Sequence, residues 1–469
     1  MRKLAISALL LGSLTPLPVA FPAGPNFVFV LVDDLGWSDL GIYGSDLHRT
    51  PRIDEFASSA MRFSNAYASS PVCTPTRASI LTGKHPAKLN MTVWREAAKN
   101  PPLQRRLLPP ITRDSLPHSE ITVAEVLRRA GYATAHVGKW HLGTAEYYPQ
   151  TQGFDYNVGG TLWGAPQTFF FPYSGDRPFR RLRYVPHLGD GAEGEYLTDR
   201  LTTEAIRILR REQGEPFFLH LAYHTVHTPI EGKPAVAETY RGRIRGGMRH
   251  RNPHLAAMVH SLDENVGRLL DAISELGAED ETVVILTSDN GGFVNKYDGL
   301  RVTDNSPLRS GKGSLYEGGI RVPAMIRWPG VTTPGTVVDV PVSSVDYYRT
   351  ILTMAGVEGD REHNASVDGI DLAPLLRGSG QRPEREALFF HYPHYYATTS
   401  PVSAVRVGDW KLLRYYEDSR VELYDLGDDI GERRDRSSDE PETAAALLKR
   451  LETWLERVGA QHPAPNTVR

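Results

Sequence analysis

The chain has 469 residues and one cysteine, Cys73, and its 53 basic and 56 acidic side chains give a net charge of −3. This near balance gives no indication of a nucleic-acid partner or of a charged membrane surface as partner. One cysteine excludes an intramolecular disulfide, so a buried apolar core must stabilise the fold, and a chain of this length can form one. The length favours more than one domain.

The first 23 residues have the organisation of a secretory signal peptide. Arg2 and Lys3 give a positive start, residues 4–14 are mostly apolar but too few to span a bilayer, and residues 16–23 are rich in proline and small residues. No later apolar run has the length of a transmembrane helix. We therefore expect residues 1–23 to be removed and the mature protein to be secreted or periplasmic, without a membrane anchor.

Two continuous apolar strands are predicted, at residues 26–32 and 282–287. Strands that are apolar on both faces are typical of a parallel sheet that helices cover on both sides. Between them, Thr122 and Glu125 form a capping-box pattern at the start of a helix, which ends before another predicted strand. This alternation predicts an α/β fold with a large, mostly parallel sheet over residues 24–378.

The pattern changes after about residue 378. Residues 404–416 predict two strands around a tight turn, and residues 421–426 predict a third strand. We therefore expect residues 379–469 to form a smaller domain, an antiparallel sheet with one packed helix. The apolar stripe of that helix comprises Ala444, Leu447, Leu448, Leu451, Trp454, Leu455 and Val458.

Oxygen-bearing side chains follow both apolar strands. Asp33 and Asp34 follow the first strand, and Asp289 and Asn290 follow the second. Ligands of open α/β sheets bind at the carboxyl ends of the strands, and carboxylates gathered there would repel one another without a cation. Oxygen ligands favour a hard ion, Ca²⁺ first and Mg²⁺ second. The alternative for each pair alone is an ordinary turn at a strand end.

The segment "CTPTRASILTG", which begins at Cys73, closely resembles the Cys-x-Pro-x-Arg signature of the type I sulfatases in the alkaline phosphatase superfamily. Other segments are similar to motifs of the same family and occur in the family's order. They are "PNFVFVLVDDLGWSDLG" from residue 25, "GYATAHVGKWHLG" from residue 131, "TSDNGG" from residue 287 and "LRSGKGSLYEGGIRVP" from residue 308. The resemblance implies an alkaline phosphatase-like fold and the hydrolysis of sulfate esters.

The resemblance also implies a use for the single cysteine. In this family a maturation enzyme oxidises the cysteine to formylglycine, whose hydrated aldehyde provides the nucleophilic oxygen. Cys73 is then a precursor, and Pro75 and Arg77 belong to the motif that the maturation enzyme recognises. The ion is expected to be held by Cys73 in its modified form together with Asp33, Asp34, Asp289 and Asn290.

Further catalytic roles follow from the same resemblance. Arg77 is expected to steady the formylglycine, and Lys139 and Lys312 to contact the sulfate. His141 matches the base that breaks down the sulfated intermediate, and His227 matches the histidine at the leaving oxygen, with His224 as the alternative.

A sulfated saccharide is the expected substrate. The stretch "FFHYPHYY" at residues 389–396 resembles a loop of carbohydrate-acting members, and aromatic residues also gather at 161–173. Aromatic faces suit a sugar ring, and neighbouring polar groups can bind its hydroxyls. The alternative is that these aromatics pack between domains. The side chains expected to contact the sugar are Trp94, Arg95, His391 and His394.

Three other functions stay open at this point. One is an arylsulfatase of broad specificity, and the second is a phosphomonoester or phosphonate-ester hydrolase of the same superfamily. The third is a sugar-binding relative without catalysis, although every catalytic position of the family motif is present here.

Overall fold

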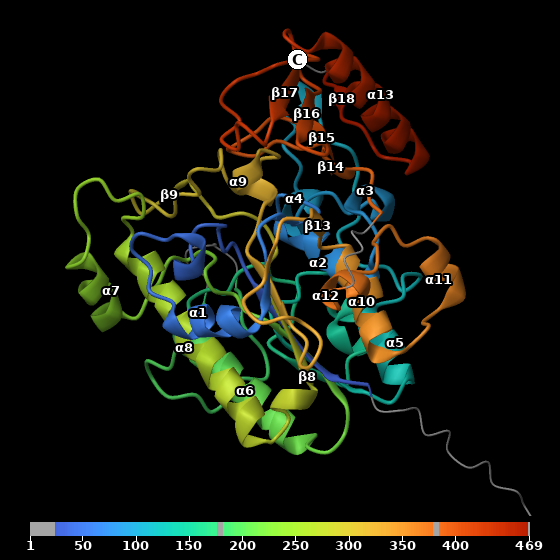
Figure 1. The fold of residues 1–469 in the computed structure, drawn as a ribbon. Coiled ribbons are helices and arrows are strands. Elements are labelled where there is room, and N and C mark those ends of the chain that lie inside the picture. Colours follow the sequence, from blue (N-terminus) through green and yellow to red (C-terminus); the bar gives the residue numbers. More distant parts are fainter. Residues whose placement is uncertain (1–23, 176–181, 379–383, 468–469) are drawn as a thin grey trace, which may run out of the picture.

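The computed structural model describes residues 24–175, 182–378 and 384–467 (Figure 1). The predicted signal peptide, residues 1–23, lies outside the described residues. Within the described part of the chain, no helix has the length and apolar character needed to cross a bilayer. The main body contains an eight-stranded sheet, and a separate four-stranded sheet forms near the C-terminus. The smaller sheet lies at the top of Figure 1, over the main body.

The eight-stranded sheet is mostly parallel, as predicted. Only β11 runs antiparallel, to both of its neighbours, β2 and β8. The two apolar strands of the sequence analysis, β1 and β8, are adjacent and parallel. In sheet order the strands are β12 (Val337–Val338), β2 (Met61–Phe63), β11 (Ala324–Arg327), β8 (Thr282–Ser288), β1 (Asn26–Val32), β7 (Phe217–Ala222), β5 (Ala133–Gly138) and β6 (Tyr156–Val158).

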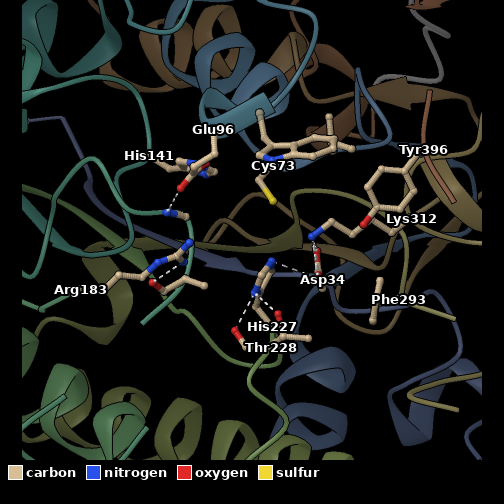
Figure 2. Close-up of a pocket in the computed structure, with 14 residues that line it drawn as sticks. Asp34, Cys73, Glu96, His141, Arg183, His227, Thr228, Phe293, Lys312 and Tyr396 are labelled. Carbon is tan, nitrogen blue, oxygen red and sulfur yellow. Dashed lines mark hydrogen bonds and ion pairs between the residues drawn. The ribbon is translucent and has the colours of Figure 1, made fainter. Parts of the chain in front are cut away.

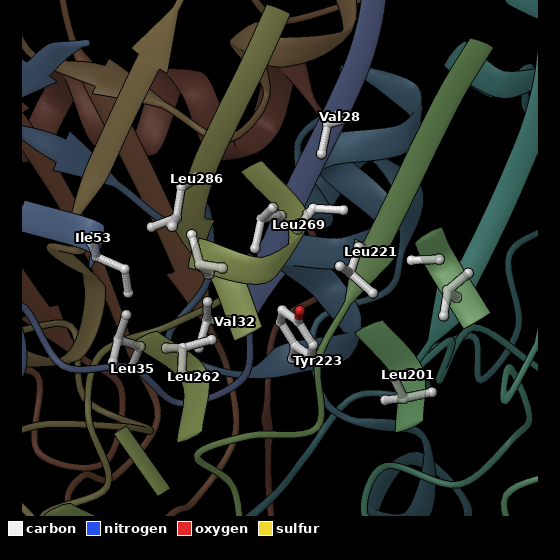
Figure 3. Packing of buried hydrophobic residues seen from close by; sticks show 14 of the residues in the cluster. Val28, Val32, Leu35, Ile53, Leu201, Leu221, Tyr223, Leu262, Leu269 and Leu286 are labelled. Carbon is white, nitrogen blue, oxygen red and sulfur yellow. The ribbon is translucent and has the colours of Figure 1, made fainter. Parts of the chain in front are cut away.

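The main sheet separates two hydrophobic cores. Along β1, Val28, Val30 and Val32 belong to one core, and Phe27 and Phe29 belong to the other. Side chains of a strand alternate between faces, so a strand that is apolar throughout supplies both cores. Figure 3 shows the first of these cores between the sheet and the helices that cover it.

Helices cover both faces of this sheet, on opposite sides in Figure 1. The first core packs against α1 (Pro51–Ser59), α6 (Leu197–Arg211) and α8 (Pro253–Glu275). The second packs against α2 (Cys73–Thr82), α5 (Val123–Arg129) and α10 (Asp346–Ala355). The capping box of α5 is present, because Thr122 Oγ1 accepts from the Glu125 N–H at 3.1 Å and Glu125 Oε2 accepts from the Thr122 N–H at 2.8 Å.

Short elements complete the main body. The helices are α3 (Pro86–Leu89), α4 (Arg95–Lys99), α7 (Pro234–Arg241), α9 (Glu317–Ile320), α11 (Arg361–Ala365) and α12 (Ala373–Leu376). The 3₁₀ turns are η1 (Gly41–Tyr43), η2 (Ala145–Tyr147), η3 (Pro149–Thr151) and η4 (Glu279–Glu281). The short strands are β3 (Ala66–Tyr67), β4 (Leu107–Leu108), β9 (Lys296–Tyr297), β10 (Leu300–Arg301) and β13 (Val342–Ser343).

The smaller sheet has one strand more than the sequence predicted. The expected strands are β15 (Val402–Val407), β16 (Trp410–Tyr415) and β17 (Val421–Asp425), and the additional edge strand is β14 (Leu388–Tyr392). β14 covers half of the stretch that the sequence analysis treated as a substrate-binding loop. Helix α13 (Pro441–Arg457) packs on this sheet through the predicted apolar stripe.

The smaller sheet and the C-terminal segment contact the main body at several points. Strand β18 (Ala464–Pro465) pairs with β4, so the end of the described chain returns to the first third of the sequence. Lys411 on β16 is fully buried, and its Nζ lies 2.8 Å from a carboxylate oxygen of Glu317 and 2.8 Å from one of Glu432. The predicted domain limits at 24–378 and 379–469 remain predictions.

Candidate active site

The paired strands β1 and β8 bring the predicted metal ligands together. Val32 lies opposite Ser288, so the residues that follow the two strands leave the sheet side by side. The Asp34 N–H donates to Asp289 Oδ1 at 3.2 Å, and Asn290 Nδ2 donates to Asp34 Oδ1 at 2.8 Å. The adjacency of the strands, which the sequence alone did not give, therefore places the four oxygen-bearing side chains in one cluster.

Cys73 is the first residue of α2 and lies beside this cluster. Its Sγ is 3.6 Å from Asp33 Oδ1, and only 2 % of the residue is exposed. Burial raises the pKa of the Cys73 thiol to about 12, so the neutral thiol is the stable form. The free N–H groups at the start of a helix favour negative charge, and α2 directs this end toward the cluster.

Three cations accompany the three carboxylates of the cluster. Arg77, one turn after Cys73 on α2, has its Nη2 2.7 Å from Asp289 Oδ2. Lys139 Nζ lies 2.7 Å from Asp33 Oδ2, and Lys312 Nζ lies 2.6 Å from Asp34 Oδ1. Each carboxylate of the cluster therefore has a cationic side chain beside it.

The pKa values of the two adjacent aspartates move in opposite directions. Burial raises the pKa of Asp33 to about 7, against the opposing effect of Lys139. Burial also acts on Asp34, but Lys312 and His227 hold the pKa of that carboxyl well below its usual range. Asp34 is thus the more strongly ionised of the two.

The cluster nevertheless fits a divalent cation. Asn290 Oδ1 is buried and has no hydrogen-bond partner among the described residues, so it can serve as a ligand. Asp33, Asp34, Cys73 and His227 each offer one ligand atom, and these atoms lie within 4.8 Å of one another. Because the side-chain charges already balance, a divalent ion would leave the cluster with two positive charges, which suits an anionic substrate.

Cys73 lines a cavity of about 230 Å³, into which its sulfur points (Figure 2). His227 lines this cavity, with its Nε2 3.6 Å from Asp34 Oδ2, whereas His224 does not line it. Burial lowers the pKa of His227 well below its ordinary value. Lys139 does not line the cavity, and its Nζ contacts Asp33. The lining residues include Asp34, Cys73, Trp94, Glu96, His141, Arg183, His227, Phe293, Lys312 and Tyr396.

Glu96 is a cavity residue that the sequence analysis did not find. Its Oε2 lies 2.7 Å from His141 Nε2, and its Oε1 accepts from the Gly164 N–H at 3.3 Å. Burial lowers the pKa of His141 to about 4, although Glu96 acts in the opposite direction, so the imidazole is neutral near pH 7. His141 has a φ of 62°, in the sparsely populated left-handed region, which indicates a position fixed by its surroundings.

Arg183 and Phe293 are further lining residues without a signal in the sequence, and Tyr396 is the last residue of the predicted sugar-binding stretch (Figure 2). Arg183 lies over the Trp163 ring, 5.3 Å from its centroid, and its Nη1 donates to the Ala165 carbonyl at 3.3 Å. These residues come from loops far apart in the chain, and only tertiary packing brings them together.

The predicted sugar-binding residues divide into two groups. Trp94 lines the cavity, and His394 lines a neighbouring groove, where its Nε2 lies 2.8 Å from Thr92 Oγ1. Arg95 is buried, 3.7 Å from Asp114, and lines neither space.

His391 corrects the sequence-based expectation of a sugar contact. Both of its ring nitrogens bond within the C-terminal part of the chain, to Ser403 Oγ at 2.7 Å and to the Gln461 carbonyl at 2.9 Å. The side chain is buried, and it lines neither the cavity nor the groove. The physical reason is that residues 388–392 form strand β14 rather than a loop.

Comparison with known proteins assigns the family. The family model described as "Sulfatase" matches residues 25–357, about seven tenths of the chain. The chain belongs to the sulfatase family. A second model, described as "N-sulphoglucosamine sulphohydrolase, C-terminal", matches residues 311–461 and so covers the smaller sheet. The resemblance drawn from the motifs is confirmed.

Similar proteins agree with this assignment. Human arylsulfatase A is 36% identical over 433 residues, which cover 86% of this sulfatase and 77% of the relative. The dog N-acetylgalactosamine-6-sulfatase is 31% identical over 409 residues, which cover 83% of this chain and 72% of the relative. The crystal structure of Ps i-CgsB matches with a TM-score of 0.77 and 29% identity, over 92% of this chain and 93% of that one. The protein is a sulfuric ester hydrolase with an alkaline phosphatase-like fold.

Proposed function

We propose that this sulfatase removes sulfate from a saccharide, using a formylglycine made from Cys73 and a divalent cation at the ends of β1 and β8. The observation that carries the proposal is that Cys73 lines the cavity beside Asp33, with Lys139 and Lys312 on the adjoining carboxylates. A nucleophile at this point faces an anionic group that enters from the cavity.

The proposed oxidation of Cys73 by a maturation enzyme rests on the motif and on the state of the thiol. Pro75 and Arg77 are both present, and the chain has no second cysteine with which Cys73 could pair. A buried neutral thiol is a weak nucleophile, because the thiolate is the reactive form. The modified residue would supply a hydrated aldehyde, one oxygen of which attacks sulfur and the other of which allows the aldehyde to be restored.

The cation is expected to be Ca²⁺, with Mg²⁺ as the alternative, because the ligands are carboxylate and amide oxygens. Asp33, Asp34, Asp289 and Asn290 would hold it together with residue 73. When bound, it would supply positive charge at a sulfate oxygen and favour the deprotonated nucleophile. Arg77 orients Asp289 through two contacts, Nε at 2.9 Å and Nη2 at 2.7 Å, and so fixes one ligand of this set.

The remaining side chains stabilise charge and move protons. Lys312 lines the cavity, where burial makes its ammonium a stronger partner for a sulfate oxygen than it is in water. His141 is neutral near pH 7 and can act as the base that restores the aldehyde. His227 lines the same cavity and is proposed to lie at the leaving oxygen of the ester.

A saccharide is the proposed substrate class. Trp94 and Tyr396 form part of the cavity wall and pack edge to face with centroids 5.4 Å apart, an arrangement that offers an aromatic surface to a sugar ring. One relative is named for N-acetylgalactosamine 6-sulfate hydrolysis, and the Ps i-CgsB protein has been crystallised with k-i-k-neocarrahexaose. These two relatives support a glycan-derived substrate, whereas other relatives are named steryl-sulfatase and arylsulfatase A, so the aromatic wall carries the choice of substrate class.

We also propose that the protein acts outside the cytoplasm, in the periplasm or after secretion, since residues 1–23 have the organisation of a signal peptide.

A panel of matched esters tests the proposed function. Protein made together with the maturation enzyme is assayed for release of sulfate from defined sulfated mono- and disaccharides and from an aryl sulfate, and for release of phosphate from the matching aryl phosphate. We expect the highest kcat/KM on a sulfated saccharide and no turnover by Cys73→Ala. A preference for the aryl ester over every saccharide would contradict the substrate class, and a preference for phosphate would contradict the reaction.

A further inference from the structure

A groove adjoins the cavity that Cys73 lines. Its volume is about 660 Å³, nearly three times that of the cavity. The two spaces share four lining residues, so they lie next to each other in the fold. The shared residues are Trp94, Glu96, Phe293 and Tyr396.

The wall of the groove combines aromatic, apolar and a few polar side chains. Tyr395 and the shared Trp94 and Tyr396 supply aromatic surface, and the segment from Ala97 to Pro110 supplies alanines and prolines. Asn100, Arg105, Thr112 and Asn295 add polar groups along the edge. This mixture is typical of sites for sugar rings, in which stacking on an apolar face is combined with hydrogen bonds at the rim.

Contacts across the fold hold the groove in place. The hydroxyl of Tyr395 donates to Glu417 Oε1 at 2.9 Å and accepts from the Leu107 N–H at 3.1 Å. The pairing of β4 with β18 lies directly beside this second contact. A rigid wall loses little conformational entropy when a ligand binds, so the groove is suited to bind without rearrangement.

The charges of the groove distinguish between possible ligands. Arg105 is its exposed cation and lies over the Tyr395 ring, 5.3 Å from the centroid. The acidic residue that lines the groove is Glu96, whose carboxylate is already hydrogen-bonded to His141 and to the Gly164 N–H. Burial lowers the pKa of His394 to about 3, so this side chain is neutral. The guanidinium of Arg105 is therefore the charged group that a ligand meets in the groove.

We infer that the groove binds the saccharide unit next to the sulfated one, and that Arg105 pairs with a carboxylate or sulfate group on that unit. The inference rests on the proposed function, because the occupant is the remainder of the same substrate chain. The sulfated unit fills the cavity that Cys73 lines, and its neighbour stacks on Tyr395. The substrate class thus narrows to an oligosaccharide with negative charge on adjacent units.

Kinetics on a set of matched sulfate esters test this inference. The esters are an aryl sulfate, a sulfated monosaccharide, and two disaccharides with the same sulfated unit, one with an anionic and one with a neutral second unit. Each disaccharide is prepared with the second unit on either side of the sulfated unit. For the wild-type enzyme we expect kcat/KM to be lowest on the monosaccharide, higher on the neutral disaccharide and highest on the anionic disaccharide. We expect this order for only one of the two linkages, the one that directs the second unit into the groove.

Two substitutions separate the aromatic from the ionic contribution. Tyr395→Ala is expected to lower the ratio of disaccharide to aryl sulfate kcat/KM by about 5- to 10-fold. Arg105→Ala is expected to lower the ratio of anionic to neutral disaccharide by about 3-fold, since the ion pair is exposed. Arg106→Ala is the matched control, because Arg106 is an exposed neighbour that does not line the groove. Arg105 is exposed, so its substitution leaves the core unchanged even if Tyr395→Ala fails to fold.

The outcomes distinguish this inference from the proposed function. If the wild-type enzyme treats monosaccharide and disaccharides alike, or if Arg105→Ala and Arg106→Ala behave identically on the anionic disaccharide, the groove inference is wrong while the saccharide sulfatase stands. If no saccharide is hydrolysed but the aryl sulfate is, the proposed function itself fails.

Discussion

Substitution of Glu96 by glutamine tests whether this residue positions His141. The carboxylate lies 2.7 Å from His141 Nε2 and is 24% exposed, so its hydrogen bond to the imidazole is short and largely shielded from solvent. This hydrogen bond fixes the tautomer of His141 that carries its proton on Nε2. Nδ1 is then unprotonated, and this buried atom has no partner among the described residues. A glutamine of the same shape lacks the charge and can present its amide N–H₂ to Nε2, which would favour the opposite tautomer.

The expected loss follows from the strength of this contact. A hydrogen bond to a charged group contributes about 2 kcal/mol, which corresponds to a decrease in kcat of roughly 30-fold. The pKa of His141 is about 4 in the folded protein, so the acid limb of the rate profile reflects protonation of this base as the pH falls through that value. Glu96 raises this pKa, so its removal should shift the acid limb of the variant to lower pH.

The assay is kcat and kcat/KM for a sulfate ester as a function of pH, with thermal unfolding as a check on the fold. Glu120→Gln is the matched control, because Glu120 is a half-buried carboxylate that pairs with Lys84 outside the cavity. A Glu96→Gln variant with wild-type kcat and an unshifted acid limb would refute the positioning role.

Further predictions concern the nucleophile, the ion and the fold. Cys73→Ser should lose nearly as much turnover as Cys73→Ala, because an alcohol cannot restore an aldehyde; substantial steady-state turnover by the serine variant would contradict this. Asp289→Ala should lose both bound metal, by elemental analysis, and activity, and retention of stoichiometric metal would argue against the ligand set. Lys411→Met should lower the free energy of unfolding by about 3–5 kcal/mol, because it leaves Glu432 buried without its cation and Glu317 with Arg321 alone, and urea denaturation measures this loss.

The sequence predicted those parts of the site that follow from local pattern and family motif. The apolar strands β1 and β8 and the aspartates after them were predicted from hydrophobicity and strand-end composition, and the structure brings them together because the two strands are neighbours. Glu96 and Arg183 carry no such pattern. Their relation to the cavity depends on how α4 and the loop near residue 183 pack against His141 and Trp163, which no short stretch of sequence encodes.

The error at His391 has a local explanation. In β14, Leu388, Phe390 and Tyr392 face one hydrophobic cluster, while Phe389 faces the cluster at α13 and stacks on Trp454 with centroids 4.7 Å apart. This alternation is typical of a strand that is buried on both faces. His391 lies on the same face of β14 as Phe389 and is therefore buried against the C-terminal segment. Its aromatic neighbours gave the stretch the composition of a sugar-binding loop.

The most direct test of the proposed chemistry relates activity to the state of residue 73. The protein is produced with graded amounts of the maturation enzyme, the fraction of aldehyde at residue 73 is measured by peptide mass spectrometry, and sulfate release from a sulfated saccharide is measured on the same samples. We predict that kcat rises in proportion to the aldehyde fraction and vanishes when residue 73 is entirely the thiol. Full sulfate release from protein with an unmodified Cys73 would contradict the account.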